Sequence, residues 1–434
     1  MRITRRHALC CSAALAAGLF TGLSTPARAG ISLREGMRNP CRGALPPDLA
    51  RHELVLQAFD GIDANALWDV HAHLLGNGDS GSGCSINPRM HEWWHPGEVL
   101  RRQAILNAAC VPGDADSVDR AYVQRLLAMT GDFPVGARWM LFAFDHACDE
   151  RGAVRADWTT FHVPNAYAAR VAREHPERFG WVASIHPYRP DALEQLADAL
   201  AQGAVALKWL PSAMAIDLRD PRCRPIYDTL ARQRVPLIVH CGEEKAVPGA
   251  GRDDLGNPLL VRAPLAAGVR VVMAHAASLG HANDLDLPSQ PPRAAFDLWA
   301  RLMDQPASQG LLHADVSAVF QSNRQPEVWR RVLTNEAWQP RLLHGSDHPL
   351  PGVMPLYAPT QLAAAGLLDA NAVEPLRRIR EHNALLFDFV LKRHLRVGAN
   401  RLAPRVFETR SLFDRDRASG YIARQPDFLP RSST

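Results

Sequence analysis

The sequence places two histidines, His71 and His73, at the end of a short apolar run that begins at Leu67. In a β-strand, side chains two residues apart point to the same face. A strand over residues 67–73 would therefore project both imidazoles together, as a metal site or a paired acid/base site requires. The pair alone is weak support for either site, because this spacing is more often a coincidence of surface or core residues.

Later apolar runs end in residues that could complete such a site. These residues are Lys208, His240, His275 and Asp347. If the runs are strands of one parallel sheet, their carboxyl ends share one rim, where the active sites of barrels are built. Together with the first pair they supply four histidines and a carboxylate, a set of nitrogen and oxygen donors that suits zinc or a similar divalent ion.

The elements that must position these residues alternate along the chain. Strand-like segments cover residues 67–73, 135–146, 179–186, 204–210, 235–240, 269–275, 311–319 and 341–347. Helical patterns cover residues 98–109, 117–129, 165–175, 191–202, 223–234, 292–304 and 326–336. Such alternation implies an α/β fold with a parallel sheet, and eight strands favour a closed (β/α)8 TIM barrel over a doubly wound sheet. The sequence has no Gly-x-Gly-x-x-Gly that opens a helix after a strand, which argues against dinucleotide binding.

Several short segments resemble those of one known family. They are Asp69-Val70-His71-Ala72-His73, Ala206-Leu207-Lys208-Trp209, Pro236-Leu237-Ile238-Val239-His240, Val272-Met273-Ala274-His275, His344-Gly345-Ser346-Asp347-His348-Pro349 and Glu381-His382-Asn383-Ala384-Leu385-Leu386-Phe387. Through them the chain resembles the amidohydrolase superfamily, in particular the metal-dependent TIM-barrel enzymes related to amidohydrolase family 2. The resemblance runs from about residue 67 to residue 391.

The resemblance implies a role for each matching residue. His71 and His73 would bind the metal, with His240 as a further ligand. Asp347 would ligate the metal or lie beside it and take a proton from the attacking water. His275 would bind a second metal in a binuclear site, or act as a catalytic histidine that polarises the substrate in a mononuclear one.

Lys208 bears on the number of metal ions. In binuclear relatives a lysine at this position is carboxylated and bridges two ions, whereas elsewhere it stays a free amine. In the family, this lysine is usually followed by an apolar residue and a histidine, but here Trp209 and Leu210 follow Lys208. This departure favours one divalent ion, of which zinc is the expected identity.

The expected function is that of a hydrolase that uses metal-activated water to cleave an amide, lactone or ester-like bond of a small molecule. The alternative is a metal-dependent non-oxidative decarboxylase of a small aromatic or unsaturated carboxylic acid, because relatives in the same branch catalyse that reaction. A binding protein with a spent site is a third hypothesis, and the complete ligand set argues against it.

The N-terminal segment resembles a twin-arginine export signal. Arg5 and Arg6 precede an apolar run, and a small-x-small site comes just before Gly30. We therefore expect recognition by the twin-arginine export machinery, a periplasmic mature protein and no stable membrane insertion after cleavage. The alternative is a membrane anchor that stays uncleaved. Residues 1–29 hold four arginines and no acid, so the net charge falls from +4 to zero without them, and we expect no nucleic-acid surface.

The remaining segments complete the expected layout. Residues 1–29 are the export signal, 30–65 an N-terminal arm, 66–397 the barrel and 398–434 a C-terminal tail, with one last helix over residues 372–395. The insertion over residues 76–96, which holds Trp93 and Trp94, is interpreted as a lid or a wall of the substrate site. Six cysteines follow the signal without a C-x-x-C pair, and their disulfide pairing is left open. Glu243 and Glu244 are expected in a solvated loop, and homo-oligomer formation is also left open.

Overall fold

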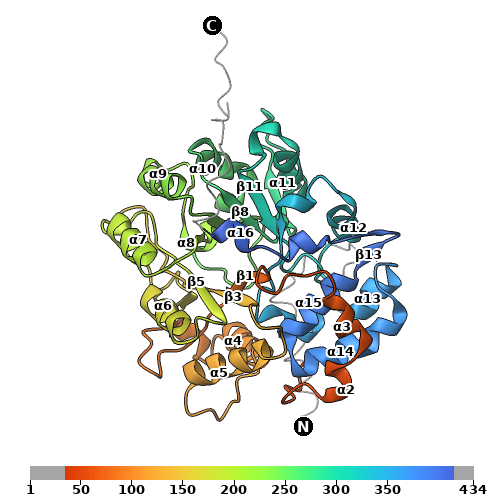
Figure 1. The fold of residues 1–434 in the computed structure, drawn as a ribbon. Coiled ribbons are helices and arrows are strands. Elements are labelled where there is room, and N and C mark those ends of the chain that lie inside the picture. Colours follow the sequence, from red (N-terminus) through yellow and green to blue (C-terminus); the bar gives the residue numbers. More distant parts are fainter. Residues whose placement is uncertain (1–34, 415–434) are drawn as a thin grey trace, which may run out of the picture.

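The structure, a computed structural model, describes residues 35–414. The predicted export signal, the first residues of the arm and the end of the tail lie outside this range. Eight parallel strands form the centre of the fold (Figure 1): β1 (Trp68–His73), β3 (Arg138–Phe142), β5 (Phe179–Val182), β6 (Leu207–Trp209), β7 (Leu237–His240), β8 (Val271–Ala274), β11 (Leu312–Asp315) and β12 (Leu342–Leu343).

The eight strands close into a ring. The strands pair in the orders β1-β3-β5 and β6-β7-β8-β11-β12. A parallel bridge between Ala183 and Leu207 joins β5 to β6, and another between Ala72 and His348 joins the end of β12 to β1. The predicted (β/α)8 barrel is therefore confirmed.

The strands are apolar on both faces because the sheet is buried from both sides, as parallel sheets are. Inside the barrel, side chains from successive strands form one small cluster that includes Val70, Met140, Ile238 and Val272. The floor of this cluster comes from the C-terminal region, where Leu412 and Phe413 of helix α16 (Arg410–Phe413) pack against it. The first part of the predicted tail thus forms part of the barrel core, and it also pairs in a short hairpin of β13 (Arg396–Val397) and β14 (Asn400–Arg401).

Helices surround the ring. They are α6 (Asn165–Glu174), α7 (Ala192–Ala201), α8 (Pro211–Met214), α9 (Arg224–Gln233), α10 (Arg262–Ala266), α11 (Ala295–Asp304), α12 (Pro326–Thr334), α13 (Pro359–Ala364), α14 (Val373–His382) and α15 (Ala384–His394). The long connection from β1 to β3 holds β2 (Ser85–Ile86), α4 (Pro96–Ala108) and α5 (Val118–Thr130), and β2 pairs with β4 (Phe161–His162).

Two predicted helices differ from those of the structure. The helix expected over residues 372–395 is two helices, because Asn383 leaves the helical conformation and its side chain accepts a hydrogen bond from the Leu386 backbone N–H. Such a residue caps the start of a new helix. The helix expected over residues 292–304 begins only at Ala295, because Pro292–Ala294 forms β10, which pairs with β9 (His281–Asn283).

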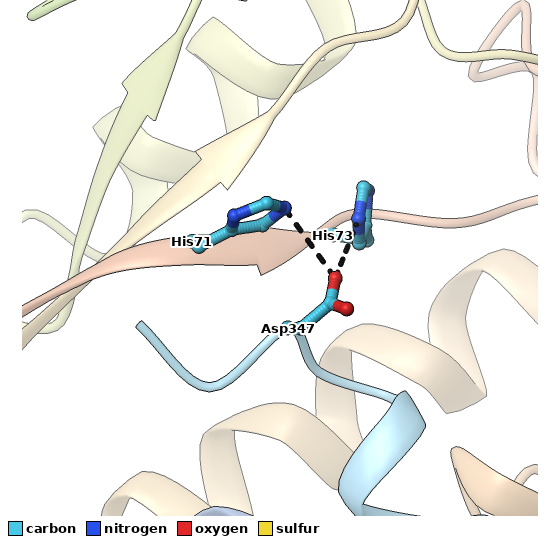
Figure 2. A group of neighbouring side chains, drawn as sticks. All are labelled: His71, His73 and Asp347. Carbon is cyan, nitrogen blue, oxygen red and sulfur yellow. Dashed lines mark hydrogen bonds and ion pairs between the residues drawn. The ribbon is translucent and has the colours of Figure 1, made fainter. Parts of the chain in front are cut away.

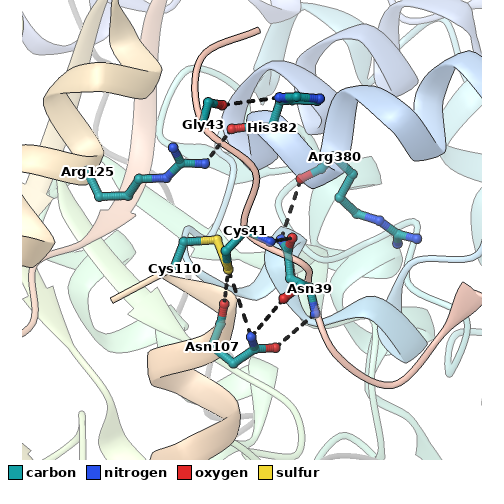
Figure 3. The surroundings of a disulfide bond; sticks show 8 residues. All are labelled: Asn39, Cys41, Gly43, Asn107, Cys110, Arg125, Arg380 and His382. Carbon is teal, nitrogen blue, oxygen red and sulfur yellow. Dashed lines mark hydrogen bonds between the residues drawn. A yellow bond between two sulfur atoms is a disulfide. The ribbon is translucent and has the colours of Figure 1, made fainter. Parts of the chain in front are cut away.

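The N-terminal arm, with α2 (Pro47–Ala50) and α3 (Glu53–Ala58), lies against α14 and α15 (Figure 1). A disulfide joins Cys41 of the arm to Cys110, just after α4 (Figure 3). Beside it, the backbone N–H of Asn39 donates to Asn107 Oδ1, and Asn107 Nδ2 donates back to the Asn39 carbonyl, both at 2.9 Å. The arm is therefore fixed to the barrel. Residues 35–414 contain no helix long and apolar enough to span a membrane.

Candidate metal centre and active site

All six residues predicted for the site line one cavity at the carboxyl end of the barrel. The cavity has a volume of about 90 Å³, and its walls include His71, His73, Lys208, His240, His275 and Asp347. Five different strand ends contribute these side chains, which agrees with the expectation that the shared rim of a barrel collects polar groups.

Asp347 and the first two histidines form the tightest group (Figure 2). Asp347 Oδ1 lies 3.4 Å from His71 Nε2 and 3.1 Å from His73 Nε2. The backbone N–H of Asp347 donates to the His71 carbonyl at 2.7 Å, and Asp347 has a positive φ of 58°. This conformation, which aspartate tolerates better than most residues, holds the carboxylate between the two imidazoles.

The two histidines reach the cavity because β1 is irregular. Its pairing with β3 shifts between Asp69 and Ala72, so Val70 packs inside the barrel and the next residue, His71, also faces inward. Asp69 holds the irregularity in place, since its Oδ1 accepts the backbone N–H groups of His71 at 3.0 Å and Ser346 at 2.9 Å. Bulges of this kind redirect side chains beside active sites.

Asp315, at the end of β11, fixes two of the imidazoles from behind. Its Oδ2 lies 2.9 Å from His71 Nδ1, and its Oδ1 accepts the backbone N–H of His275 at 3.0 Å. His275 Nδ1 lies 2.8 Å from Ser317 Oγ and 3.1 Å from the Ser317 carbonyl oxygen. In the tautomers that this network assigns, both Nδ1 atoms carry the proton, so both Nε2 atoms keep a free lone pair.

Glu244 plays the same part for His240, with Oε2 3.2 Å from His240 Nδ1. His240 Nε2 is buried and has no hydrogen-bond partner among the described residues. A metal ion would satisfy this nitrogen, and metal-binding histidines characteristically donate their other ring N–H to a carboxylate or carbonyl. The donor set therefore fits a metal ion.

The electrostatics keep these groups in the forms that bind metal. Burial lowers the pKa of His71, to which the nearby Lys208 adds, and burial also lowers the pKa of His240 and His275. Burial opposes ionisation of Asp347, but its pKa still lies well below its usual range, because the surrounding histidines, including the hydrogen bond with His73, favour the carboxylate. Neutral imidazoles and an ionised carboxylate are the ligand forms of zinc.

His71, His275 and Asp315 form a second group whose donor atoms lie close enough together for an ion. We interpret Asp315 instead as the residue that orients the two rings, because its oxygens are occupied by the Nδ1–H and backbone N–H groups described above. Its side chain is fully buried and is not among the residues that line the cavity.

Lys208 lies in the wall of the cavity without a carboxylate partner. It is almost completely buried, and its Nζ lies 5.1 Å from the centre of the Phe142 ring. No acidic group in residues 35–414 lies within ion-pair distance of it. Burial lowers the pKa of Lys208, and the carboxylates of Asp315 and Asp347 act in the opposite direction.

Sequence reasoning missed several residues around the cavity. It did not single out Asp315, although this acid ends a strand, and it placed Glu244 in a solvated loop, whereas its side chain is 8% exposed. Trp93 and Trp94 were expected to wall the substrate site, but they are 82% and 58% exposed and are not among the described residues that line the cavity. Ile105 of α4 takes that place.

The chain resembles several solved structures, all at low identity. An uncharacterized TIM-barrel protein from Bordetella bronchiseptica is 16% identical, with 71% of this chain and 94% of that one covered and a TM-score of 0.41. 4-Oxalomesaconate hydratase from Rhodopseudomonas palustris is 14% identical, with 74% of this chain and 96% of that one covered and a TM-score of 0.38. 2,6-Dihydroxybenzoate decarboxylase from Rhizobium is 14% identical, with 60% of this chain and 87% of that one covered and a TM-score of 0.36.

The comparison with protein families is decisive. No curated protein sequence matches the chain. The sequence profile of the family described as amidohydrolase matches residues 68–386, well over half of the 434 residues and the whole of the barrel strands. The chain therefore belongs to the amidohydrolase superfamily of metal-dependent enzymes.

Proposed function

We propose that this protein is a metal-dependent hydrolase that cleaves an amide, lactone or ester-like bond of a small molecule. The observation that carries the proposal is the position of the Asp347 carboxylate. One oxygen lies between His71 Nε2 and His73 Nε2, and the other lies 3.9 Å from His275 Nε2. One carboxylate oxygen can therefore coordinate a metal ion together with the two histidines, while the other oxygen exchanges a proton.

The ligands of the metal would be His71, His73, His240 and Asp347. When bound, a divalent ion such as zinc supplies two effects, a lowered pKa of water and polarisation of a carbonyl oxygen. We propose one ion per chain, because Lys208 stands against the Phe142 ring and is followed by Trp209 and Leu210 where a histidine is usual in the family.

The chain's own residues then handle the proton. Asp347 takes it from the attacking water and delivers it to the leaving group, a role within reach of a buried ionised carboxylate. His275 Nε2, whose lone pair faces Asp347, can share that proton, while Ser317 holds the opposite side of the ring. The small cavity favours a small substrate, since pockets for drug-sized ligands span about 300–1,000 Å³.

Decarboxylation is the second candidate, and the apolar part of the cavity favours it. Phe144, Phe161, Leu210 and Leu279 line the wall. Removing water from around a carboxylate destabilises its charge, which assists the loss of carbon dioxide. The same metal ligands would serve either reaction.

A panel of small molecules separates the two reactions. The zinc-loaded protein is incubated with small lactones, esters and amides, and with aromatic and unsaturated acids. We expect hydrolysis of a member of the first group, abolished by a chelator and reduced by Asp347→Asn. Release of carbon dioxide from an acid, without hydrolysis of any ester, lactone or amide, would overturn the proposal in favour of decarboxylation.

We also propose that the protein is exported to the periplasm by the twin-arginine machinery. The sequence around Arg5 and Arg6 motivates this proposal, and the disulfide between Cys41 and Cys110 supports it, because structural disulfides persist in oxidising compartments and are rare in the cytosol. The mature chain would begin near Gly30.

A further inference from the structure

We propose that Arg324 binds a carboxylate of the substrate, so that the substrate is a small organic anion. This inference rests on the proposed function, because it assigns the substrate class of the same site. It concerns a residue that belongs neither to the metal ligands nor to the proton-transfer groups.

Arg324 is a buried cation in the wall of the cavity. Its side chain lines the same cavity as His240 and Asp347, and the residue is 6% exposed. It follows β11, the strand that lies between β8 and β12 in the sheet. The segment that carries Arg324 thus lies between the elements that carry His275 and Asp347, and its side chain enters the cavity that these residues share.

The hydrogen bonds of Arg324 are all to neutral oxygens. Nε donates to Ser278 Oγ at 3.1 Å, and Nη1 donates to Gln321 Oε1 at 2.9 Å and to Asn323 Oδ1 at 2.7 Å. Among residues 35–414, none accepts a hydrogen bond from Nη2 and none offers a carboxylate within ion-pair distance. Three contacts fix the orientation of the guanidinium, while the two N–H groups of Nη2 stay free to donate.

A buried charge without a counter-charge is costly, so it usually has a partner or a purpose. Burial lowers the pKa of Arg324 to about 10, but the group stays protonated at neutral pH. The two N–H groups of Nη2 remain to donate charge-assisted hydrogen bonds to a carboxylate. A bound carboxylate would therefore supply both the missing charge and the missing acceptors.

The other charged groups of the cavity balance one another. Glu243 pairs with Lys245, while the carboxylates of Glu244 and Asp347 contact neutral histidines. Lys208 is buried in the same wall without an acidic partner within ion-pair distance among the described residues. Arg324 and Lys208 together offset the two carboxylates, so a bound divalent ion would make the cavity positive and favour an anionic substrate over a neutral one.

Binding of matched probes to the zinc-loaded full chain tests the proposal. Butyrate and its neutral counterpart butyramide are titrated by calorimetry into wild type, Arg324→Gln and Lys245→Gln. We expect Arg324→Gln to weaken butyrate binding at least about tenfold, because a charge-assisted hydrogen bond is lost, and to leave butyramide unchanged. Lys245→Gln, which removes a cation that is already paired, should change neither probe more than about twofold.

Two further measurements keep the test decisive. Arg324→Lys keeps the charge but not the fixed orientation of the Nη2 donors, so its affinity for butyrate should lie between those of wild type and Arg324→Gln. Zinc content and melting temperature are recorded for each variant. Equal affinity of Arg324→Gln and wild type for butyrate would overturn the proposal, as would butyrate binding that depends on zinc and not on Arg324. If butyrate binding depends on Arg324 but the wild type hydrolyses no member of the substrate panel, only the proposed reaction is overturned.

Discussion

Changing Asp315 to asparagine should damage the metal site without altering its shape. Asparagine has the same size as aspartate, but one of its two terminal atoms becomes a donor. Asp315 Oδ1 accepts the backbone N–H groups of His275 at 3.0 Å and Ser317 at 3.1 Å, and also the Ser317 hydroxyl. The amide oxygen must take this position, because an NH2 group there would face three donors.

The amide nitrogen must then take the place of Oδ2, which lies 2.9 Å from His71 Nδ1. His71 Nδ1 can no longer donate and has to accept a hydrogen bond instead. The ring proton therefore moves to Nε2, the nitrogen that faces Asp347 and would bind the metal. The variant holds His71 in the tautomer that cannot be a ligand.

The expected loss of zinc affinity is about 100-fold, the upper end of the range for residues that orient metal ligands. This corresponds to about 2.7 kcal/mol. Zinc affinity is measured by competition with a chromogenic chelator, for wild type, Asp315→Asn and Ser317→Ala. Ser317→Ala is the matched control: it removes a hydroxyl from the same network, but His275 Nδ1 keeps the Ser317 carbonyl and His71 keeps Asp315.

Zinc affinity of Asp315→Asn within about threefold of wild type would refute this reasoning, because the amide would then be tolerated beside Nδ1. A loss of equal size in Ser317→Ala would refute it as well, since general disturbance of the network would explain both variants. Circular dichroism of the two variants establishes that the barrel is intact before affinities are compared.

Four further predictions follow from the sequence and the site. His73→Ala should lose most of the bound metal, measured by elemental analysis, because too few ligands remain to offset dehydration of the ion; full occupancy would place the site elsewhere. Wild type and Lys208→Ala should each hold one ion per chain, and two ions falling to one in the variant would instead establish a carboxylated bridging lysine. The unfolding free energy should fall as pH drops from about 6.5 towards 4: burial lowers the pKa of His313 to about 4, so below its ordinary pKa the unfolded chain binds the proton more readily than the folded one. Denaturant titrations of wild type and His313→Asn at several pH values check this. If the difference in unfolding free energy between the two proteins does not change with pH, the prediction is contradicted. Changing both Arg5 and Arg6 to lysine should leave a precursor in the cytoplasm, seen by cell fractionation, whereas normal export would exclude the twin-arginine route.

The sequence was sufficient for the barrel because its signals are periodic and repeated. Eight strand-like segments, most of them separated by helical patterns, indicate a parallel closed sheet, and the structure confirms that fold. The shared rim follows from the same topology, which is why the polar residues at strand ends can be grouped from the sequence alone. The helix over residues 372–395 was wrong for a local reason, since the capping role of Asn383 is hidden inside an otherwise continuous helical pattern.

Strict alternation of side chains does not by itself predict the candidate site, because the chain departs from regular strand geometry where the chemistry is placed. His71 faces the cavity through the irregularity in β1, and His275 and Asp347 have positive φ values of 56° and 58°. Such conformations cost about 1–3 kcal/mol each and persist only where the surroundings hold them. Asp69 and Asp315 provide that support through hydrogen bonds to backbone N–H groups.

These supporting acids explain why sequence reasoning finds ligands more readily than the residues that position them. A ligand has a recognisable type and lies at a strand end, whereas Asp69 and Asp315 also act on atoms far away in the sequence: 277 residues separate Asp69 from Ser346, and 244 residues separate Asp315 from His71. Burial raises the pKa of Asp69 to about 6 despite those hydrogen bonds, which shows the cost of placing an acid there. Positioning of the ligands therefore depends on contacts across the whole barrel, and the local pattern around His71 encodes only part of it.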